Sequence, residues 1–479
     1  MNSYNTSIFE MHSNTGGVCT GWKRKEYIFD GAMHWLVGTK PGSPFYKIWD
    51  ELGVTKGWNV FNHDRFMIAE GTNGKTLTFY ADINRLEQHM MDLAPEDSKV
   101  IHDFANAVRT FRKIDIPVDK APELYNLIDM VKMVKMLPYL RLTNKWSKIT
   151  TRDFMEQFKN PFMREILSAT LVRDTPDFPV FFMLFTFVWL DQKMAGYLVG
   201  GARELTNNIE KRYLSLGGEL SLSSRVDKIL VENDRAVGIQ TADGKEYRSD
   251  IVISAADGHT TLFEMLKGKY LDNKTRSYYE NPQLFPPLIY ISLGVARSFI
   301  GSPPSVAGIN FPLSEPIIIA GKENKWMGVQ IYNFDSTLAP KGKTVIKIQF
   351  TTDYEFWKKL HQESELYKLE KDRIAKEVIN RLDKRFPGIS TQVEVRDVAT
   401  PITWERYTGN WRGSYEGWLL KKWKLNTHMK KTLAGLDNFY MVGQWVEPGG
   451  GMPTAVMSGR NVTQLICKND NKGFISNGP

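Results

Sequence analysis

The residues best suited to chemistry lie near the C-terminus, in the stretch FYMVGQWVEPGGGMPTAVMSGR between positions 439 and 460. The apolar run at its start predicts a short buried strand that ends at Gly443. Three consecutive glycines, 449 to 451, follow, and a turn without Cβ atoms lets a bulky planar or phosphorylated ligand touch the backbone. Pro453 fixes the φ angle needed at the start of a helix, which we expect to run to residue 466. The free N–H groups of that helix would stabilise negative charge on the ligand, unless the stretch is only a glycine-rich loop before an ordinary helix.

The beginning of the chain places a carboxylate at the end of another predicted strand. Residues 6 to 9 have the β-branched and apolar character of a strand, and Glu10 closes it. In βαβ units that bind dinucleotides, an acidic residue at the end of the second strand accepts a hydrogen bond from a ribose hydroxyl. Glu10 stands where such a residue would stand.

The segment from Ser7 to Gly38, SIFEMHSNTGGVCTGWKRKEYIFDGAMHWLVG, resembles flavoproteins of the phytoene desaturase and retinol saturase type. In that family the glutamate binds the adenosine ribose of FAD, a Gly-Gly pair passes close to the cofactor, and an aromatic-Asp-Gly segment leads towards the flavin. Glu10, the glycine pair at 16 and 17, and the segment Phe29–Gly31 match these positions. The resemblance implies that His34 and Trp35 lie near the flavin, whereas on its own His34 would be read as a hydrogen-bonded core histidine.

Two later segments resemble the same family, in the family's order, and lead to the terminal glycine turn. The stretch AGYLVGGAREL matches a Tyr-x-x-Gly-Gly turn beside the flavin, and Val226 matches a residue whose backbone contacts the adenine. The stretch TPITWERYTGNWRGSYEGW, residues 400 to 418, is similar to the aromatic loop that returns to the cofactor before the last strand and helix.

The resemblance therefore implies FAD as the cofactor, together with a set of site residues. The residues expected to bind FAD are Glu10, Gly16, Gly17, Val226, Gly443, Gly450, Gly451, Met452 and Pro453. The residues expected on the face shared by flavin and substrate are His34, Trp35, Tyr197, Gly200 and Gly201. No residue is assigned a catalytic role, and no metal site, Ser-His-Asp set or carboxylate pair is apparent, which fits chemistry carried by a cofactor.

One departure from the family concerns the start of the chain. The family begins with a strand, a G-x-G-x-x-G fingerprint and a helix, and neither the residues before Glu10 nor any later segment contain that fingerprint. The chain is thus expected to start one strand and one helix late, through a mis-assigned start codon, a cloned fragment or gene decay. An absent central strand and phosphate-binding helix would make the chain poorly soluble or weak in FAD binding.

Composition limits the classes of function. The 479 residues are too many for one core, and a net charge of +8 spread along the chain does not indicate nucleic acid as a partner. Cys19 and Cys467 are the only cysteines, which excludes a disulfide framework and fits a reducing, cytoplasmic location. The longest apolar run, residues 178 to 190, is too short to span a bilayer.

A segment of different character runs from residue 130 to 148, MVKMVKMLPYLRLTNKWSK. Its methionines, leucines and one tryptophan alternate with lysines and arginine, which is typical of a segment that lies among anionic headgroups. It predicts a peripheral contact with the inner face of a membrane. The alternative is an ordinary core-facing helix broken at Pro138.

The predicted fold class is mixed α/β: a discontinuous Rossmann-like FAD domain, N-terminally truncated, with an inserted substrate domain of mixed sheet and helices. Strands are expected at 288–295 and 344–350, and a helix with an apolar stripe is expected before Pro387. The six aromatics in residues 178–190 would line an apolar cavity or pack between domains. The expected division is residues 1–80, 196–258 and 400–479 for the FAD domain, 81–195 for a helical membrane-associated insertion, and 259–399 for the substrate domain.

The resemblance implies an FAD-dependent oxidoreductase that saturates or desaturates carbon–carbon bonds of an apolar, carotenoid-like or retinoid-like substrate. A flavin amine oxidase is an alternative with the same fold, for which Trp404, Tyr407, Trp411 and Tyr415 could form an aromatic cage. A non-catalytic isoprenoid-binding protein or an inactive truncated fragment is a third possibility. The substrate, the direction of reaction, the electron acceptor and the oligomeric state are left open.

Overall fold

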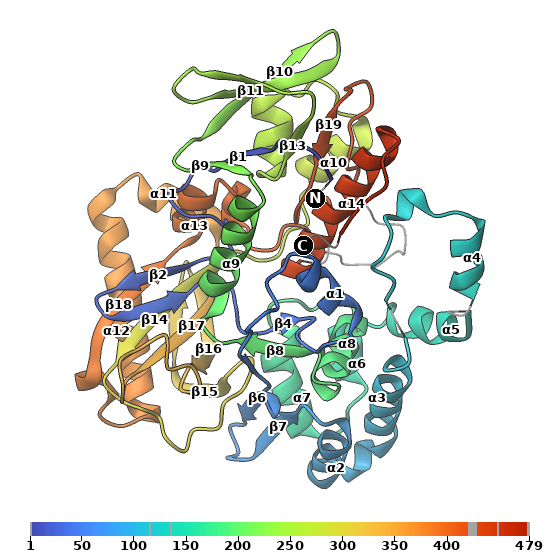
Figure 1. Cartoon of the computed structure of the whole chain (residues 1–479). Helices are drawn as coiled ribbons and strands as arrows, with labels where there is room; N and C mark the ends of the chain where they lie inside the picture. The colour runs from blue at the N-terminus through green and yellow to red at the C-terminus, as the bar shows by residue number, and fades with distance from the viewer. Residues whose placement is uncertain (1, 115, 135–136, 420–428, 448–449, 477–479) are drawn as a thin grey trace.

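The computed structural model describes residues 2–476 apart from 115, 135–136, 420–428 and 448–449 (Figure 1). Its largest element is a seven-stranded sheet in the order β18-β14-β17-β16-β15-β6-β7. All neighbours are antiparallel except the parallel pair β15 and β6. The strands are β6 (Arg65–Glu70), β7 (Thr76–Tyr80), β14 (Leu288–Val295), β15 (Ile309–Ile319), β16 (Lys322–Ile331), β17 (Thr344–Thr351) and β18 (Val393–Ala399).

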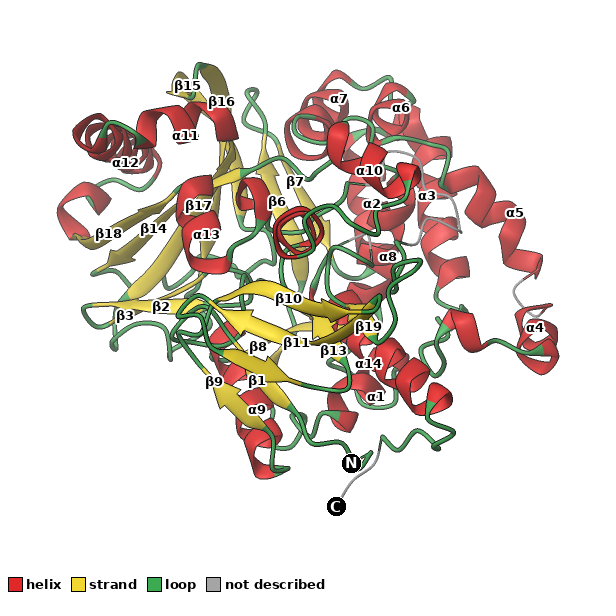
Figure 2. Cartoon of the chain, turned by 90° about the horizontal axis from the view of Figure 1, so that it is seen from above, coloured by secondary structure: helices red, strands yellow, loops and turns green. Residues whose placement is uncertain are grey.

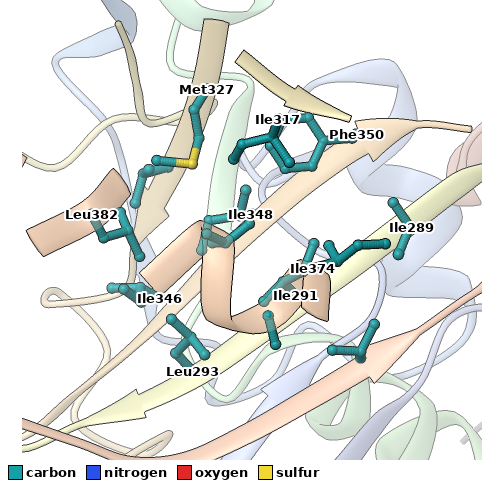
Figure 3. Packing of buried hydrophobic residues seen from close by; sticks show 14 of the residues in the cluster. Ile289, Ile291, Leu293, Ile317, Met327, Ile346, Ile348, Phe350, Ile374 and Leu382 are labelled. Atoms are coloured by element: carbon teal, nitrogen blue, oxygen red, sulfur yellow. The ribbon is translucent and has the colours of Figure 1, made fainter. Parts of the chain in front are cut away.

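The apolar residues of the central strands form the main core. Alternate residues of β14, including Ile289, Ile291 and Leu293, pack against Ile346 and Ile348 of β17 (Figure 3). Helices α11 (Tyr354–His361) and α12 (Ser364–Arg385) belong to the same core. The expected strands at 288–295 and 344–350 and the expected amphipathic helix are therefore confirmed.

Several smaller sheets make up the part of the chain that carries the predicted nucleotide site. Strand β1 (Ser7–Phe9) pairs in parallel with β9 (Glu219–Ser221), and β13 (Val252–Ser254) pairs in parallel with β19 (Phe439–Met441). Beside them lie the antiparallel sheet β10-β11-β12, the hairpin β2-β3 and the sheet β4-β8-β5 (Figure 1). The remaining strands are β2 (Gly21–Arg24), β3 (Tyr27–Asp30), β4 (Leu36–Val37), β5 (Val60–Phe61), β8 (Ala195–Leu198), β10 (Val226–Glu232), β11 (Arg235–Thr241) and β12 (Glu246–Arg248).

Two helices, α14 (Met452–Asn469) and α9 (Gly201–Ser215), begin at glycine turns that follow strands of these small sheets. Helix α14 begins directly after the glycine turn, as expected, and α9 begins at the Gly200–Gly201 turn. The two ends of the chain meet, because the Tyr4 hydroxyl donates to Asp470 just beyond α14 at 2.6 Å. The remaining helices outside the helical part are α1 (Pro44–Glu51), α10 (Asn273–Glu280), α13 (Pro401–Thr408), η4 (Thr260–Met265), η5 (Ile389–Gln392) and η6 (Trp411–Gly413).

A helical part lies on the opposite side of the molecule from α12, as Figure 2 shows. Its core is aromatic: Phe181 and Phe185 of α8 pack against Phe111, and Phe187 packs against Phe104. Most of the aromatics at 178–190 therefore serve as packing within this part. Its elements are α2 (Ile83–Leu93), η1 (Pro95–Asp97), α3 (Ser98–Phe111), η2 (Pro122–Leu124), α4 (Leu127–Val134), α5 (Leu137–Trp146), α6 (Thr151–Glu156), α7 (Pro161–Leu167), η3 (Ser168–Val172) and α8 (Val180–Asp191).

Helices α4 and α5 project from the body of the protein in both views (Figures 1 and 2). They carry a group of large apolar side chains that are 41% to 83% exposed: Leu127, Ile128, Met130, Val131, Val134, Leu137 and Leu140. In the described part of the chain, none of the helices combines the length and apolar character needed to cross a bilayer.

Candidate functional site

The glycine turn at the C-terminus and the glycine pair near the N-terminus meet in the structure. The thiol of Cys19 lies 3.0 Å from the sulfur of Met452, the first residue of α14. The backbone N–H of Cys19 donates to the carbonyl of Gly16, so the turn at Gly16 and Gly17 lies beside the start of α14. Two segments more than 400 residues apart in sequence thus form one site.

The start of α14 has the features of an anion-binding turn. Gly450 and Gly451 have φ angles of +72° and +87°, which only glycine adopts freely. Pro453 lies in the first turn, and no side chain of the described residues caps the free N–H groups of this helix. Gly443, at the end of β19, donates its N–H to the hydroxyl of Ser458 in α14 and so fixes the strand against the helix. Gly449, the first glycine expected in this turn, lies outside the described residues.

Two glycines of the site face open space. A Cβ atom added at Gly17 or Gly443 would meet nothing within 4 Å, and both residues have positive φ. A flat ligand can therefore contact the backbone atoms of these two residues directly, which a Cβ atom at either position would prevent. Together with the uncapped start of α14, they fit a dinucleotide cofactor with a planar ring.

Glu10 stands at the end of β1, as expected. One carboxylate oxygen accepts the backbone N–H of His12 at 2.8 Å, and burial raises the pKa of the side chain. Glu10 forms no ion pair within the described ranges of the chain, and the backbone of Met11 also stabilises its charged form. Val226 lies half-buried at the first position of β10, paired with Thr241.

We expect Glu10→Ala to weaken FAD binding by about 1–3 kcal/mol, because a charge-assisted hydrogen bond to a ribose hydroxyl would be lost. Titration of the apoprotein with FAD measures the effect. Glu26→Ala, at an exposed position of the β2–β3 hairpin, is the matched control and should leave the affinity unchanged. Equal affinities of the two variants would show that the ribose lies elsewhere.

The Tyr-x-x-Gly-Gly turn is held by two buried carboxylates. Asp335 accepts hydrogen bonds from the Tyr197 hydroxyl and the Gly200 N–H, each at 2.9 Å. Asp30 accepts the N–H of Ala202 at the start of α9. A Cβ at Gly201 would lie 2.0 Å from an oxygen of Asp30, which explains why glycine is needed there. In this structure Tyr197 and Gly200 are held by Asp335, and Gly201 leaves room for the carboxylate of Asp30.

A second polar group lies on the face of the large sheet opposite α12, where the alternation of β-strand side chains places Tyr290 and Lys347. The Lys347 side chain is 2% exposed, and its ammonium donates to the carbonyl oxygen of Asp30 at 3.3 Å. It also lies 5.7 Å and 5.6 Å from the ring centres of Tyr290 and Tyr332. Burial lowers the pKa of Lys347 to about 8, while the nearby Asp30 opposes that shift.

Neither Lys347 nor Tyr290 stands out in the amino-acid sequence as a site residue. The one feature of the sequence that could have indicated Lys347 is its place between two isoleucines in the predicted strand TVIKIQFT. A lysine at such a position is usually expected to point into solvent from a strand at the edge of a sheet. The structure instead buries it between the sheet and the segment that ends at Asp30.

His34 and Trp35 lie next to this polar group. Their rings stack with centroids 6.4 Å apart, and burial together with the charge of Lys347 lowers the pKa of His34 to about 3. His63 lies nearby, neither of its ring nitrogens has a hydrogen-bond partner among the residues that the structure describes, and burial lowers its pKa to about 4. Both histidines are therefore neutral at physiological pH.

Aromatic side chains connect this region to a crevice between α1, α3 and α8. Trp35 contacts Trp189 at 6.1 Å, and Trp189 contacts Phe185 at 5.7 Å, measured between ring centres. The crevice has a volume of about 30 Å³ and a mainly apolar wall formed by Val37, Phe45, Ile114, Ile116, Phe185, Val188 and Trp189. Its polar lining includes Arg112, which is paired with Asp191.

The solved structures that resemble this chain share its fold. An oxidoreductase from Methanosarcina mazei superimposes with a TM-score of 0.57 at 16% identity, covering 96% of this chain and 94% of its own. A variant of putrescine oxidase gives a TM-score of 0.58 at 13% identity, covering 96% and 93%. The expected mixed α/β fold class is confirmed.

Curated relatives include proteins of carotenoid metabolism. Prolycopene isomerase of Daucus carota is 28% identical over 274 residues, which cover 55% of this chain and 42% of that protein. Phytoene desaturase (neurosporene-forming) of Rhodobacter capsulatus is 23% identical and covers 88% of this chain and 82% of its own. The chain spans about half the length of the prolycopene isomerases that it matches.

A family model described as flavin containing amine oxidoreductase matches residues 1–467. This match spans nearly the whole chain, including the turn at Gly16, the Gly200–Gly201 turn and the start of α14. The expected resemblance to flavoproteins of the phytoene desaturase type is confirmed by the curated relatives. The chain therefore belongs to the flavin containing amine oxidoreductase family, and its cofactor is FAD.

Proposed function

We propose that this protein is an FAD-dependent oxidoreductase that acts on carbon–carbon bonds of an apolar polyene. The residues proposed to hold FAD are Glu10, Gly16, Gly17, Val226, Gly443, Gly450, Gly451, Met452 and Pro453. The flavin ring would lie between the start of α14 and the polar group around Lys347, with His34 and Trp35 on the substrate side. The division into an FAD part and a substrate part built on the seven-stranded sheet belongs to the same proposal.

The observation that carries this proposal is the continuous aromatic path from His34 to the crevice. An apolar polyene gains stability from contact with aromatic and aliphatic walls and requires few polar partners. The crevice is too narrow for a polyene as it stands, so Trp189 would have to turn aside to admit one. The relatives, which include a phytoene desaturase and prolycopene isomerases, support the same substrate class.

The amine oxidase alternative is less well supported, because its aromatic cage does not assemble. Trp404 packs on Trp22 and Tyr290, Tyr407 contacts His12, and Trp411 stacks on His259. Within the described part of the chain, none of these three rings is paired with another of the set or with Tyr415. The charge of Lys347 beside the site also opposes an ammonium substrate.

FAD held by Glu10, by the glycine pair at 16 and 17 and by the start of α14 would supply the capacity to exchange a hydride with a substrate carbon. The protein positions the reacting carbon, excludes water through its buried aromatic walls, and provides the start of α14 to stabilise negative charge. The buried ammonium of Lys347 adds a positive charge to the same region.

The test is anaerobic mixing of the flavin-loaded protein with phytoene in vesicles, and separately with putrescine. We expect bleaching of the flavin absorbance with phytoene and none with putrescine. Bleaching with putrescine alone would establish the amine oxidase alternative.

We further propose that helices α4 and α5 place the protein on an anionic membrane surface. The exposed apolar side chains described for these helices, Leu127 to Leu140, would enter the headgroup layer. Arg141, Lys145 and Lys148 are exposed nearby, so the surface combines apolar contact with positive charge. A polyene dissolved in the bilayer would then be close to the protein.

We expect the double variant Leu127→Asp/Val131→Asp to lose binding to phosphatidylserine vesicles by about 100-fold or more, since each buried apolar side chain contributes about 1.5–3 kcal/mol. Co-sedimentation measures the effect. Leu369→Asp, at a position of α12 that is 62% exposed, is the matched control and should bind like the wild type. Unchanged binding of the double variant would exclude this surface.

A further inference from the structure

A carboxylate lies directly against the glycine turn at the start of α14. Glu416 belongs to the loop after η6, and a Cβ added at Gly450 would lie 2.8 Å from its carboxyl carbon. The side chain therefore occupies space that any residue other than glycine at position 450 would fill. Because Gly450 lies in the turn proposed to touch the flavin, Glu416 is brought to the edge of the same site.

Glu416 has no partner among the described residues, in contrast to Glu405 of α13 and Glu355 of α11. Glu405 accepts the hydroxyl of Tyr354, and Glu355 pairs with Arg412. For Glu416, the described residues supply neither a cation nor a hydrogen-bond donor, and burial raises its pKa to about 7. The side chain is half-buried and makes no stabilising bond with the described residues, so a structural role does not explain its position.

The groups that face Glu416 come from several elements. Tyr290 of β14 is 4% exposed, and the charge of Glu416 contributes to a raised pKa of this phenol and of Tyr415. Behind Tyr290 lie Lys347 of β17 and Asp30 at the end of β3. The carboxyl group thus lies at one end of a row of titratable groups between the sheet and the glycine turn.

We propose that Glu416 is the proton-exchanging catalytic residue of this site, a role that rests on the proposed function. In the oxidation of a carbon–carbon single bond, one C–H bond breaks and its electron pair leaves as a hydride to the flavin. The C–H bond of the adjacent carbon breaks towards the Glu416 carboxylate, which takes the proton, and the remaining electron pair forms the double bond. The carboxylic acid then returns its proton to water.

The first test uses the flavin-loaded protein without substrate. The flavin absorbance is titrated between about pH 5 and 9 in the wild type, in Glu416→Gln and in Glu365→Gln, which changes an exposed carboxylate of α12 in the same way. We expect a spectral transition near neutral pH in the wild type and in Glu365→Gln, and its loss in Glu416→Gln. A transition that persists in Glu416→Gln, or is absent from the wild type, overturns the assignment.

The second test measures phytoene oxidation by the same three proteins. We expect kcat to fall by about 10²–10⁴-fold in Glu416→Gln with little change in KM, and to lose its dependence on an ionisation near neutral pH. Turnover that survives Glu416→Gln overturns only the role of Glu416. No turnover by the wild type overturns the proposed function itself, and the two failures are therefore distinguishable.

Discussion

Replacement of Arg460 by leucine should lower the free energy of unfolding by about 3–5 kcal/mol, because it leaves a buried carboxylate without its partner. Arg460 of α14 forms two bonds with Glu51 at the end of α1, at 2.6 and 3.0 Å, and both side chains are less than 10% exposed. The same guanidinium donates to the carbonyls of Val118 and Asp119. One side chain therefore ties the cofactor helix to α1 and to the segment that leads to α4.

Urea unfolding followed by circular dichroism measures this effect. Arg373→Leu is the control, since Arg373 also contacts two glutamates but is 38% exposed, and we expect a loss of about 1 kcal/mol or less. The double variant Glu51→Leu/Arg460→Leu should be more stable than Arg460→Leu alone, because it removes the unpaired carboxylate. A loss below 1 kcal/mol in Arg460→Leu would contradict this account.

Replacement of Lys347 by methionine should have the opposite effect to Arg460→Leu and raise the free energy of unfolding at pH 7. The pKa of Lys347 falls from 10.5 in the unfolded chain to about 8 in the folded protein. That shift, which already includes the attraction to Asp30, corresponds to about 3 kcal/mol, and this figure is the upper limit of the gain expected when the charge is removed. Methionine has a similar length and no charge to desolvate.

The pH dependence follows from linkage. Below pH 8 both states of the wild type hold the proton, and the folded state bears the full cost of the buried charge. Between pH 8 and 10.5 the unfolded state holds more protons, so the wild type gains stability as the pH rises. The advantage of Lys347→Met should therefore be constant below pH 8 and shrink above it. Lys343→Met, at a partly exposed ion pair with Glu394, is the matched control for removal of a lysine charge.

A stabilised Lys347→Met protein that oxidises phytoene more slowly than the wild type would show that the lysine is kept for function at a cost in stability. Both quantities are measured on the same preparation, by urea unfolding across the pH range and by anaerobic flavin bleaching. A variant that is less stable than the wild type at pH 7 would show that the ammonium is held by stronger interactions than its contact with Asp30.

The sequence by itself determined the local elements of this protein. A short apolar run ending in glycine predicted β19, and the proline after three glycines predicted the start of α14. Period-two and 3.6-residue patterns predicted β14, β17 and α12. These predictions succeed because turns, helix starts and strand faces depend on residues close together in the chain.

Only the tertiary structure decided which distant groups meet. Asp30, Tyr290, Lys347 and Glu416 belong to four separate segments, and each residue type is common enough to carry no signal alone. Strand periodicity separates the two faces of β14 and β17 but does not say what covers each face. Here one face is covered by α12 and the other by the segment that ends at Asp30, so a lysine that the pattern would assign to solvent lies buried beside the proposed flavin site.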